Sequence, residues 1–150
     1  MISFTVPGKP APQPRMRGRI MGRGPKARVG MYTPAVGGEW REAVTKAAAE
    51  AMEGKEILEG PVYTTITIRI PRPQSHLRAN GEVRETAPKA PINMRSGDVD
   101  NLAKAIMDRM NKVVWHDDAQ VVILRVMKIY TTEEPGADVK AALLEQAGPA

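Results

Sequence analysis

The chain has 150 residues, the length of one ordinary domain and enough to bury a hydrophobic core without metal ions or disulfides. It contains no cysteine, which excludes a disulfide framework and a thiolate zinc site, and it has neither a membrane-spanning stretch nor the pattern of a signal peptide, so we expect a cytoplasmic protein. Lys and Arg outnumber Asp and Glu by 22 to 17, and this net charge of +5 favours a polyanionic partner.

The first predicted element is a short strand. Residues 2–6 alternate apolar and polar side chains, which is typical of a half-buried strand, and Pro7 and Gly8 end the pattern.

A basic arm of about residues 9–35 follows this strand. Between Lys9 and Arg28 the chain has seven cationic residues, no acidic residue, and glycines and prolines that exclude a continuous helix and favour an extended backbone. We predict that the arm binds DNA phosphates, while a solvated charged loop would have the same pattern. The predicted DNA-binding residues of the arm are Lys9, Arg15, Arg17, Arg19, Arg23, Lys26 and Arg28.

The middle of the chain predicts a helix, a strand and a long loop. Apolar residues recur at helical spacing from Glu39, and Gly54 is placed to end that helix. Residues 62–70 are rich in Thr, Ile and Tyr and predict a strand. The polar, basic segment of about residues 71–97 predicts a loop of a length that is typically functional or disordered. Its Arg72 and Arg95 join the predicted DNA-binding residues.

The remaining residues complete the predicted fold. A second helix is expected from Asp98 or Asp100 to about Lys112, and strands are expected over residues 121–130 and 139–144. The order strand, helix, strand, helix, strand, strand predicts an α+β fold. We expect a single small domain over residues 1–150, with a mixed β-sheet flanked by two main helices.

Four aspartates occupy two places that present side chains, the start of the second helix and the turn before the next strand. They are Asp98, Asp100, Asp117 and Asp118. If the helix and the strand pack as neighbours, these carboxylates converge into an oxygen-only cluster. Such a cluster suits a hard divalent cation, Mg²⁺ with Mn²⁺ as a substitute, better than zinc or copper.

Lys104 adds a positive charge near these acids. It shares one helix face with Asp100 and Asp108, because the three are spaced four residues apart, and it is placed to contact a substrate phosphate. Carboxylates that hold a cation, combined with a fixed positive charge, are what phosphodiester hydrolysis requires. The residues therefore predict a metal-dependent nuclease site.

Each part of this site also has a structural explanation. Asp98 or Asp100 can cap the helix, and Lys104 can form surface ion pairs of about 0.3–0.5 kcal/mol. Asp117 and Asp118 can be turn residues. The two histidines and two tryptophans are expected to be structural rather than catalytic or base-stacking. The combination of four acids, a lysine and two basic loops favours the nuclease.

A set of motifs runs from the first strand almost to the C-terminus. Its centre is Asp-x-Asp-Asn-x-x-Lys over residues 98–104 and Asp-Asp-x-Gln over residues 117–120. Residues 4–10 belong to the set, and its further members are Arg15, Arg17, Asp108 and Lys128. These motifs resemble the RusA family of Holliday-junction resolvases, which are crossover junction endodeoxyribonucleases.

The resemblance implies a RusA-like fold and a homodimer that resolves four-way DNA junctions by paired nicks, in DNA recombination and repair. By position, Asp98, Asp100 and Asp118 would be catalytic acids that bind Mg²⁺ or Mn²⁺, with Asp117 as a neighbouring ligand, and Lys104 would be the catalytic lysine. It implies no small-molecule cofactor beyond the metal, no membrane partner, and a bacterial or phage-encoded (including prophage-encoded) protein.

Two departures from the family pattern leave alternatives open. Residues 95–97 stand where the family often has a proline next to the first acid, and the loop of residues 71–97 is comparatively long. A longer basic loop would also suit a nuclease for other branched DNA, such as flaps and forks. The alternative from another class is a catalytically silent DNA-binding protein.

Overall fold

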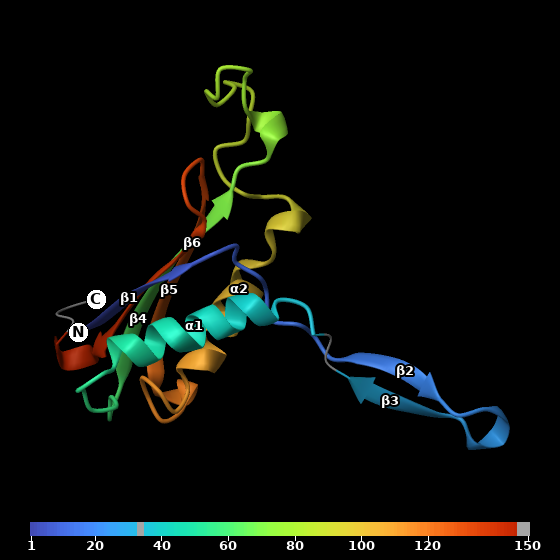
Figure 1. The fold of residues 1–150 in the computed structure, drawn as a ribbon. Coiled ribbons are helices and arrows are strands. Elements are labelled where there is room, and N and C mark those ends of the chain that lie inside the picture. The colour runs from blue at the N-terminus through green and yellow to red at the C-terminus, as the bar shows by residue number, and fades with distance from the viewer. Residues whose placement is uncertain (33–34, 147–150) are drawn as a thin grey trace.

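The computed structural model describes residues 1–32 and 35–146, and it confirms the predicted α+β fold (Figure 1). A four-stranded mixed sheet carries two helices on one face, and a separate two-stranded hairpin extends away from it. In chain order the main elements are β1 (Ile2–Pro7), β2 (Arg17–Met21), β3 (Arg28–Tyr32), α1 (Gly38–Ala51), β4 (Val62–Pro71), α2 (Val99–Met110), β5 (Val121–Thr131) and β6 (Gly136–Leu143).

The sheet has one buried face and one open face because side chains alternate along each strand. In β4 every second residue is buried against the helices, and the residues between them are half-buried on the open face. Both tryptophans are in the core, as predicted, with Trp40 4% and Trp115 0% exposed. The largest other buried side chains of the core are Ile66, Ile68, Leu102, Ile106 and Met110.

The helices cover the core face side by side. α1 lies against β1, α2 lies against β5, and the two helices contact each other. Each buries one apolar stripe, which is why periodic spacing predicted both of them. Neither helix is long and apolar enough to cross a membrane, a statement that covers the described residues.

The strand order is β1-β6-β4-β5, with β4 parallel to β5 and the other neighbours antiparallel. β6 begins at Gly136 rather than at Val139, the predicted start. Gly136 pairs with Pro7 and lies directly against the backbone of Val6, where a Cβ atom would collide with the Val6 carbonyl oxygen. The strand can therefore start at this residue only because it is a glycine.

An ion pair links three strands on the open face. Arg69 of β4 donates a hydrogen bond to the Asp138 carboxylate of β6, and the Thr5 hydroxyl of β1 donates to the same carboxylate at 2.8 Å. Partial burial works to raise the pKa of Asp138, but the hydrogen bonds from Arg69 and Thr5 outweigh it and keep that pKa below its ordinary value of 3.8.

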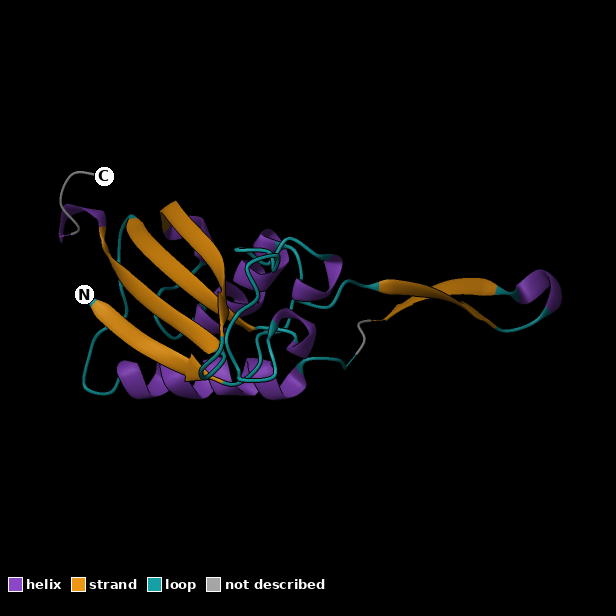
Figure 2. Cartoon of the chain, turned by 90° about the horizontal axis from the view of Figure 1, so that it is seen from above, coloured by secondary structure: helices purple, strands orange, loops and turns teal. Residues whose placement is uncertain are grey.

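The basic arm, for which an extended backbone was predicted, forms a β-hairpin. β2 and β3 pair antiparallel with each other, and the hairpin projects from the domain (Figure 2). Gly22 and Gly24 adopt positive φ angles of 84° and 64° in the connection, which lets the chain reverse and pair with itself. Residues 33 and 34 of the predicted arm lie outside the described residues, as do residues 147–150 of the predicted domain.

The long loop between β4 and α2 is built from turns. It contains two short 3₁₀ helices, Gln74–His76 and Met94–Ser96. Its own backbone hydrogen bonds hold it, among them Arg84 N–H to the His76 carbonyl at 2.8 Å. The segment thus has local structure of its own, which periodicity does not reveal because each turn is only three residues long.

Candidate active site

Asp98 lies at the start of α2, and its carboxylate is not used as a helix cap. Its backbone occupies the N-cap position with an extended conformation, but its side chain makes no capping hydrogen bond. The side chain is 71% exposed and lies 3.7 Å from Nη2 of Arg15. The capping explanation therefore does not apply to Asp98, and its oxygens are accessible to a cation.

Asp100, Lys104 and Asp108 follow one another along one face of α2, as their spacing predicted. Asp100 is exposed in the first turn, and Nζ of Lys104 lies 3.3 Å from Oδ1 of Asp108. The opposite face is buried. An exposed ion pair of this kind contributes little to stability, so Lys104 can exchange Asp108 for a phosphate at small cost.

The two adjacent acids before β5 have different environments. The Ala119 N–H donates to the Asp117 carboxylate at 2.8 Å, and this bond, with a second one involving Asp118, keeps the pKa of Asp117 below its ordinary value. The side chain of Gln120 accepts in return from the Asp117 N–H, which completes a capping box. Asp117 thus stabilises the turn, while Asp118 faces the cavity described next.

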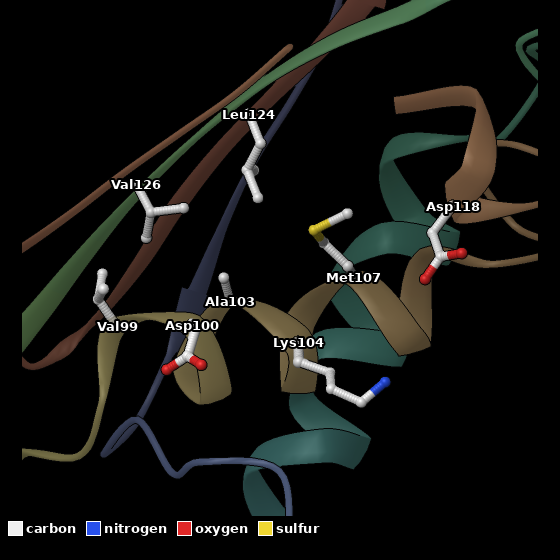
Figure 3. Close-up of a pocket in the computed structure, with 8 residues that line it drawn as sticks. All are labelled: Val99, Asp100, Ala103, Lys104, Met107, Asp118, Leu124 and Val126. Atoms are coloured by element: carbon white, nitrogen blue, oxygen red, sulfur yellow. The ribbon is translucent and has the colours of Figure 1, made fainter. Parts of the chain in front are cut away.

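A cavity of about 480 Å³ lies between α2 and β5. Asp100, Lys104 and Asp118 line it, and its remaining walls are apolar. Figure 3 shows Lys104 and Met107 between Asp100 and Asp118, so the two acids stand toward opposite ends. The full lining is Val99, Asp100, Ala103, Lys104, Met107, Asp118, Leu124 and Val126.

The predicted convergence of four carboxylates is not observed within one chain. Among the described residues, no three His, Cys, Asp or Glu side chains gather closely enough to hold a metal ion. The reason is the length of α2. α2 has 12 residues and is about 18 Å long; Asp98 and Asp100 stand at its beginning and Asp117 and Asp118 follow its end, so most of the helix lies between the two groups. Packing of the helix beside the strand does not bring its opposite ends together.

The donor chemistry nevertheless fits a hard divalent cation. Asp98 and Asp100 offer exposed carboxylate oxygens two residues apart, without imidazole or thiolate neighbours. Mg²⁺ is commonly held by one or two carboxylates, several waters and substrate phosphates, rather than by a closed protein cage. These two residues are therefore sufficient to begin a magnesium site and insufficient to complete one.

Arg15 connects the hairpin to this end of α2. With the Asn101 amide oriented so that its oxygen faces Arg15, that oxygen accepts from Nε and Nη2 at 3.1 and 2.9 Å. The backbone N–H of Gln13 also donates to the Asn101 carbonyl at 3.0 Å. The chain that leads into the hairpin is thus anchored beside Asp98, and the hairpin carries the exposed residues Arg17, Arg19, Arg23, Lys26 and Arg28.

Three further predicted DNA-binding residues lie around one depression at the base of the long loop. Lys9, Arg72 and Arg95 line this depression, although they are far apart in the sequence. Arg72 also holds the loop in place, because its guanidinium stacks 4.5 Å from the centre of the Tyr130 ring and donates to the Pro88 carbonyl at 2.8 Å.

Lys128 belongs to the set of family motifs, but the sequence predicted no role for it; in the structure it is a positioning residue. From β5 its Nζ donates to Ser96 Oγ at 2.9 Å and to the Gly97 carbonyl at 2.7 Å. These bonds fix the turn that delivers Asp98. One sequence signal could have revealed this role. Lys128 alternates with Val126 and Tyr130 in β5, at a position where an apolar residue facing the helices is expected.

Two comparisons relate the chain to known proteins. The family described as "Endodeoxyribonuclease RusA" matches residues 7–141, nearly the whole chain. The chain is also similar to the uncharacterized protein YqaN of Bacillus subtilis (strain 168), with 34% identity over 139 residues, which is 92% of this chain and 93% of that protein. The chain therefore belongs to the RusA family of endodeoxyribonucleases.

Proposed function

We propose that the protein is a Mg²⁺-dependent endonuclease that, as a homodimer, resolves four-way DNA junctions by paired nicks in recombination and repair. The observation that carries the proposal is the placement of Asp100, Lys104 and Asp118 in one cavity, with the arginine hairpin anchored beside it through Arg15. Membership of an endodeoxyribonuclease family supports the reaction class. Such a role belongs in the bacterial cytoplasm, for a host-encoded or a phage-encoded protein.

Each residue of the candidate site has its own proposed role in the chemistry. Asp98, Asp100 and Asp118 are the proposed metal ligands, with Asp117 less suited because the Ala119 N–H occupies one of its oxygens. When bound, Mg²⁺, or Mn²⁺ in its place, would activate water and neutralise charge on the phosphate. Lys104 would contact the phosphate and stabilise the negative charge that develops on it. Substrate phosphates and a second chain would supply the donors that one chain lacks.

The cationic residues would hold the branched DNA. The cationic side chains of the hairpin are exposed, and the hairpin itself projects away from the domain (Figure 2), where it can follow a DNA backbone beyond the cut site. Lys9, Arg72 and Arg95 form a second group by the long loop. Two such groups, one on the hairpin and one by the long loop, suit a branched substrate better than a linear one, since its arms diverge from the cutting site.

The long loop and hairpin also support a nuclease whose preferred branch is a flap or a fork. Both substrates present diverging arms, so the same cationic groups would contact them. The silent DNA-binding alternative is weaker, because Asp98 and Asp100 are exposed and Asp98 does not cap the helix; its exposed ion pair with Arg15 contributes little to stability. Comparison of cleavage on matched branched substrates separates the two nuclease proposals.

The test is the variant Asp100→Asn. It preserves size and helix position and removes one carboxylate charge, so we expect junction binding at the wild-type level or tighter and loss of magnesium-dependent cleavage. Asp108→Asn, on the same helix face but outside the cavity, is the matched control and should still cleave. Full cleavage by Asp100→Asn would refute the proposed site.

A further inference from the structure

The hairpin of β2 and β3 is a two-stranded ribbon whose two faces differ in chemistry. Directly opposite residues of an antiparallel pair point to the same face, and neighbours along a strand point to opposite faces. The pairing register therefore assigns each residue of the hairpin to one face. The cationic face carries Arg17, Arg19, Met21, Arg28 and Tyr32, and the apolar face carries Ile20, Val29 and Met31.

Contacts within the ribbon agree with this division. The guanidinium of Arg19 lies 5.8 Å from the centre of the Tyr32 ring, so these two side chains share the cationic face. A Cβ atom at Gly30 would collide with the side chain of Met21, which places Met21 on that face as well. The register and the side-chain contacts thus define the same two faces.

Both faces are open to a partner. The apolar side chains are exposed, with Ile20 at 78%, Val29 at 69% and Met31 at 58%. Within the described part of the chain, no cationic side chain of the hairpin forms a salt bridge. Figure 2 shows the ribbon extending away from the sheet and the helices. An exposed apolar face beside an exposed cationic face suits a polyanion that also offers apolar groups.

The side chains of the hairpin fit the minor groove of DNA better than the major groove. Residues 17–32 contain no Asn, Gln, Asp or Glu, which are the side chains that pair with adenine and cytosine edges in the major groove. Arginine is attracted to the negative potential of the narrow minor groove, and Ile, Met and Pro are residues that minor-groove proteins place against base steps. A ribbon in the major groove lays one face on the base edges, which would leave the apolar face of this projecting hairpin uncovered.

We propose that the hairpin enters the minor groove of one duplex arm of the branched substrate. Its cationic face contacts phosphates at the rim of the groove, and its apolar face packs against the deoxyribose wall and the base steps. This inference rests on the proposed nuclease function and gives the hairpin a specific site on the DNA. Entry of a ribbon widens the groove, and the contacts that the deformed DNA gains offset that cost.

The tip and the length of the hairpin support this binding mode. Pro25 is exposed in the turn between the strands, so a rigid apolar side chain without a backbone donor leads the ribbon. Each strand has five residues, about 17 Å, which corresponds to the rise of about five base pairs. Because Arg15 anchors the base of the hairpin beside Asp98, the tip reaches about five base pairs or more from the cutting site.

Affinity cleavage from the tip identifies the groove. The chain has no cysteine, so Ala27→Cys provides a single thiol at an exposed tip position, to which iron-EDTA is attached. This protein is bound without Mg²⁺ to a four-way junction that is labelled on each strand in turn. We expect scission of both strands of one arm, with the two maxima offset toward the 3′ side across the groove, which is the pattern of a reagent in the minor groove. Glu53→Cys, exposed in the turn after α1, is the matched control and should give no localised scission.

The double variant Ile20→Thr, Val29→Thr tests the apolar face. Threonine is β-branched, so the variant keeps the strand propensity of the ribbon while hydroxyl groups replace apolar atoms. We expect its junction affinity in EDTA to fall about tenfold with an unchanged salt slope, because no cation is removed. The variant Arg19→Ala, Arg28→Ala should by contrast reduce the salt slope.

The outcomes separate groove binding from the nuclease. A 5′ offset, which is the pattern of the major groove, scission no greater than that of Glu53→Cys, or unchanged affinity of the threonine variant would overturn the minor-groove inference. A lower oligomeric mass of the threonine variant in sedimentation would also overturn it, by assigning the apolar face to a contact between copies. A wild type that still nicks junctions in Mg²⁺ in these cases leaves the nuclease proposal standing. Scission with the 3′ offset by a protein that makes no magnesium-dependent nicks would refute the nuclease proposal alone.

Discussion

Replacement of Lys128 by methionine tests how the turn before Asp98, a proposed metal ligand, is held in place. Methionine keeps most of the apolar stem and removes the ammonium, so Ser96 Oγ loses a donor and the Gly97 carbonyl loses the bond from Nζ. Ser96 is only 7% exposed, which limits replacement of the lost donor by water. Loss of hydrogen bonds from a charged donor at this partly buried site costs about 2 kcal/mol.

The expected result has a thermal part and a catalytic part. For a domain of this size, 2 kcal/mol lowers the Tm of Lys128→Met by about 4–8 °C. Cleavage should fall by about tenfold or more while junction affinity in EDTA stays at the wild-type level, since displacement of Asp98 affects the chemistry. Lys140→Met removes an exposed lysine from β6 and serves as the control. A Lys128→Met protein with the Tm of Lys140→Met would refute this role.

Three further predictions concern the acids and the hairpin. Asp117→Ala should lose about 1 kcal/mol of stability in thermal unfolding and keep cleavage, whereas Asp118→Asn should keep its Tm and lose cleavage; the reverse pattern would exchange their roles. The double variant Arg19→Ala, Arg28→Ala should bind junctions more weakly and reduce the slope of log affinity against log salt by about 2, and an unchanged slope would exclude these residues from the DNA contact. Because the pKa of Asp138 in the folded protein lies below its ordinary value of 3.8, its contribution to stability is present above pH 3.8 and is lost as the pH falls through the lowered pKa. Asp138→Asn should therefore destabilise the protein at about pH 7 and show a smaller further loss on acidification to about pH 3 in urea unfolding, while a wild-type pH profile would contradict the ion-pair assignment.

The sequence predicted the elements whose signals are local. Apolar spacing placed α1 and α2 to within a few residues, and the run of Thr and Ile placed β4, because one buried face imposes a period that is visible without the fold. The start of β6 was predicted too late, since Gly136 joins the strand through its close approach to Val6. This close approach is a tertiary contact, and the presence of a glycine in the sequence is not enough to predict it.

The geometry of the candidate site depended on information that spacing does not contain. Because consecutive elements usually pack as neighbours, we predicted that the aspartates of the second helix and of the turn before the next strand converge. The length of α2 keeps Asp98 apart from Asp118. The proposed difference in role between Asp117 and Asp118 rests mainly on the hydrogen bond that the Ala119 N–H donates to the Asp117 carboxylate. Likewise, the role of Lys128 depends on the long loop that brings residues 96 and 97 beside β5. Residue spacing does not predict such features, because they depend on contacts between segments distant in sequence or on different environments of two adjacent side chains.

The most direct test of the nuclease account is incubation of the purified protein with an end-labelled four-way junction and with a linear duplex of the same sequence, in Mg²⁺ and in EDTA. Products are resolved under denaturing conditions. The account predicts symmetrical nicks in opposing strands of the junction, in Mg²⁺ alone, with the duplex left intact. Binding of the junction without cleavage in either Mg²⁺ or Mn²⁺ would contradict it.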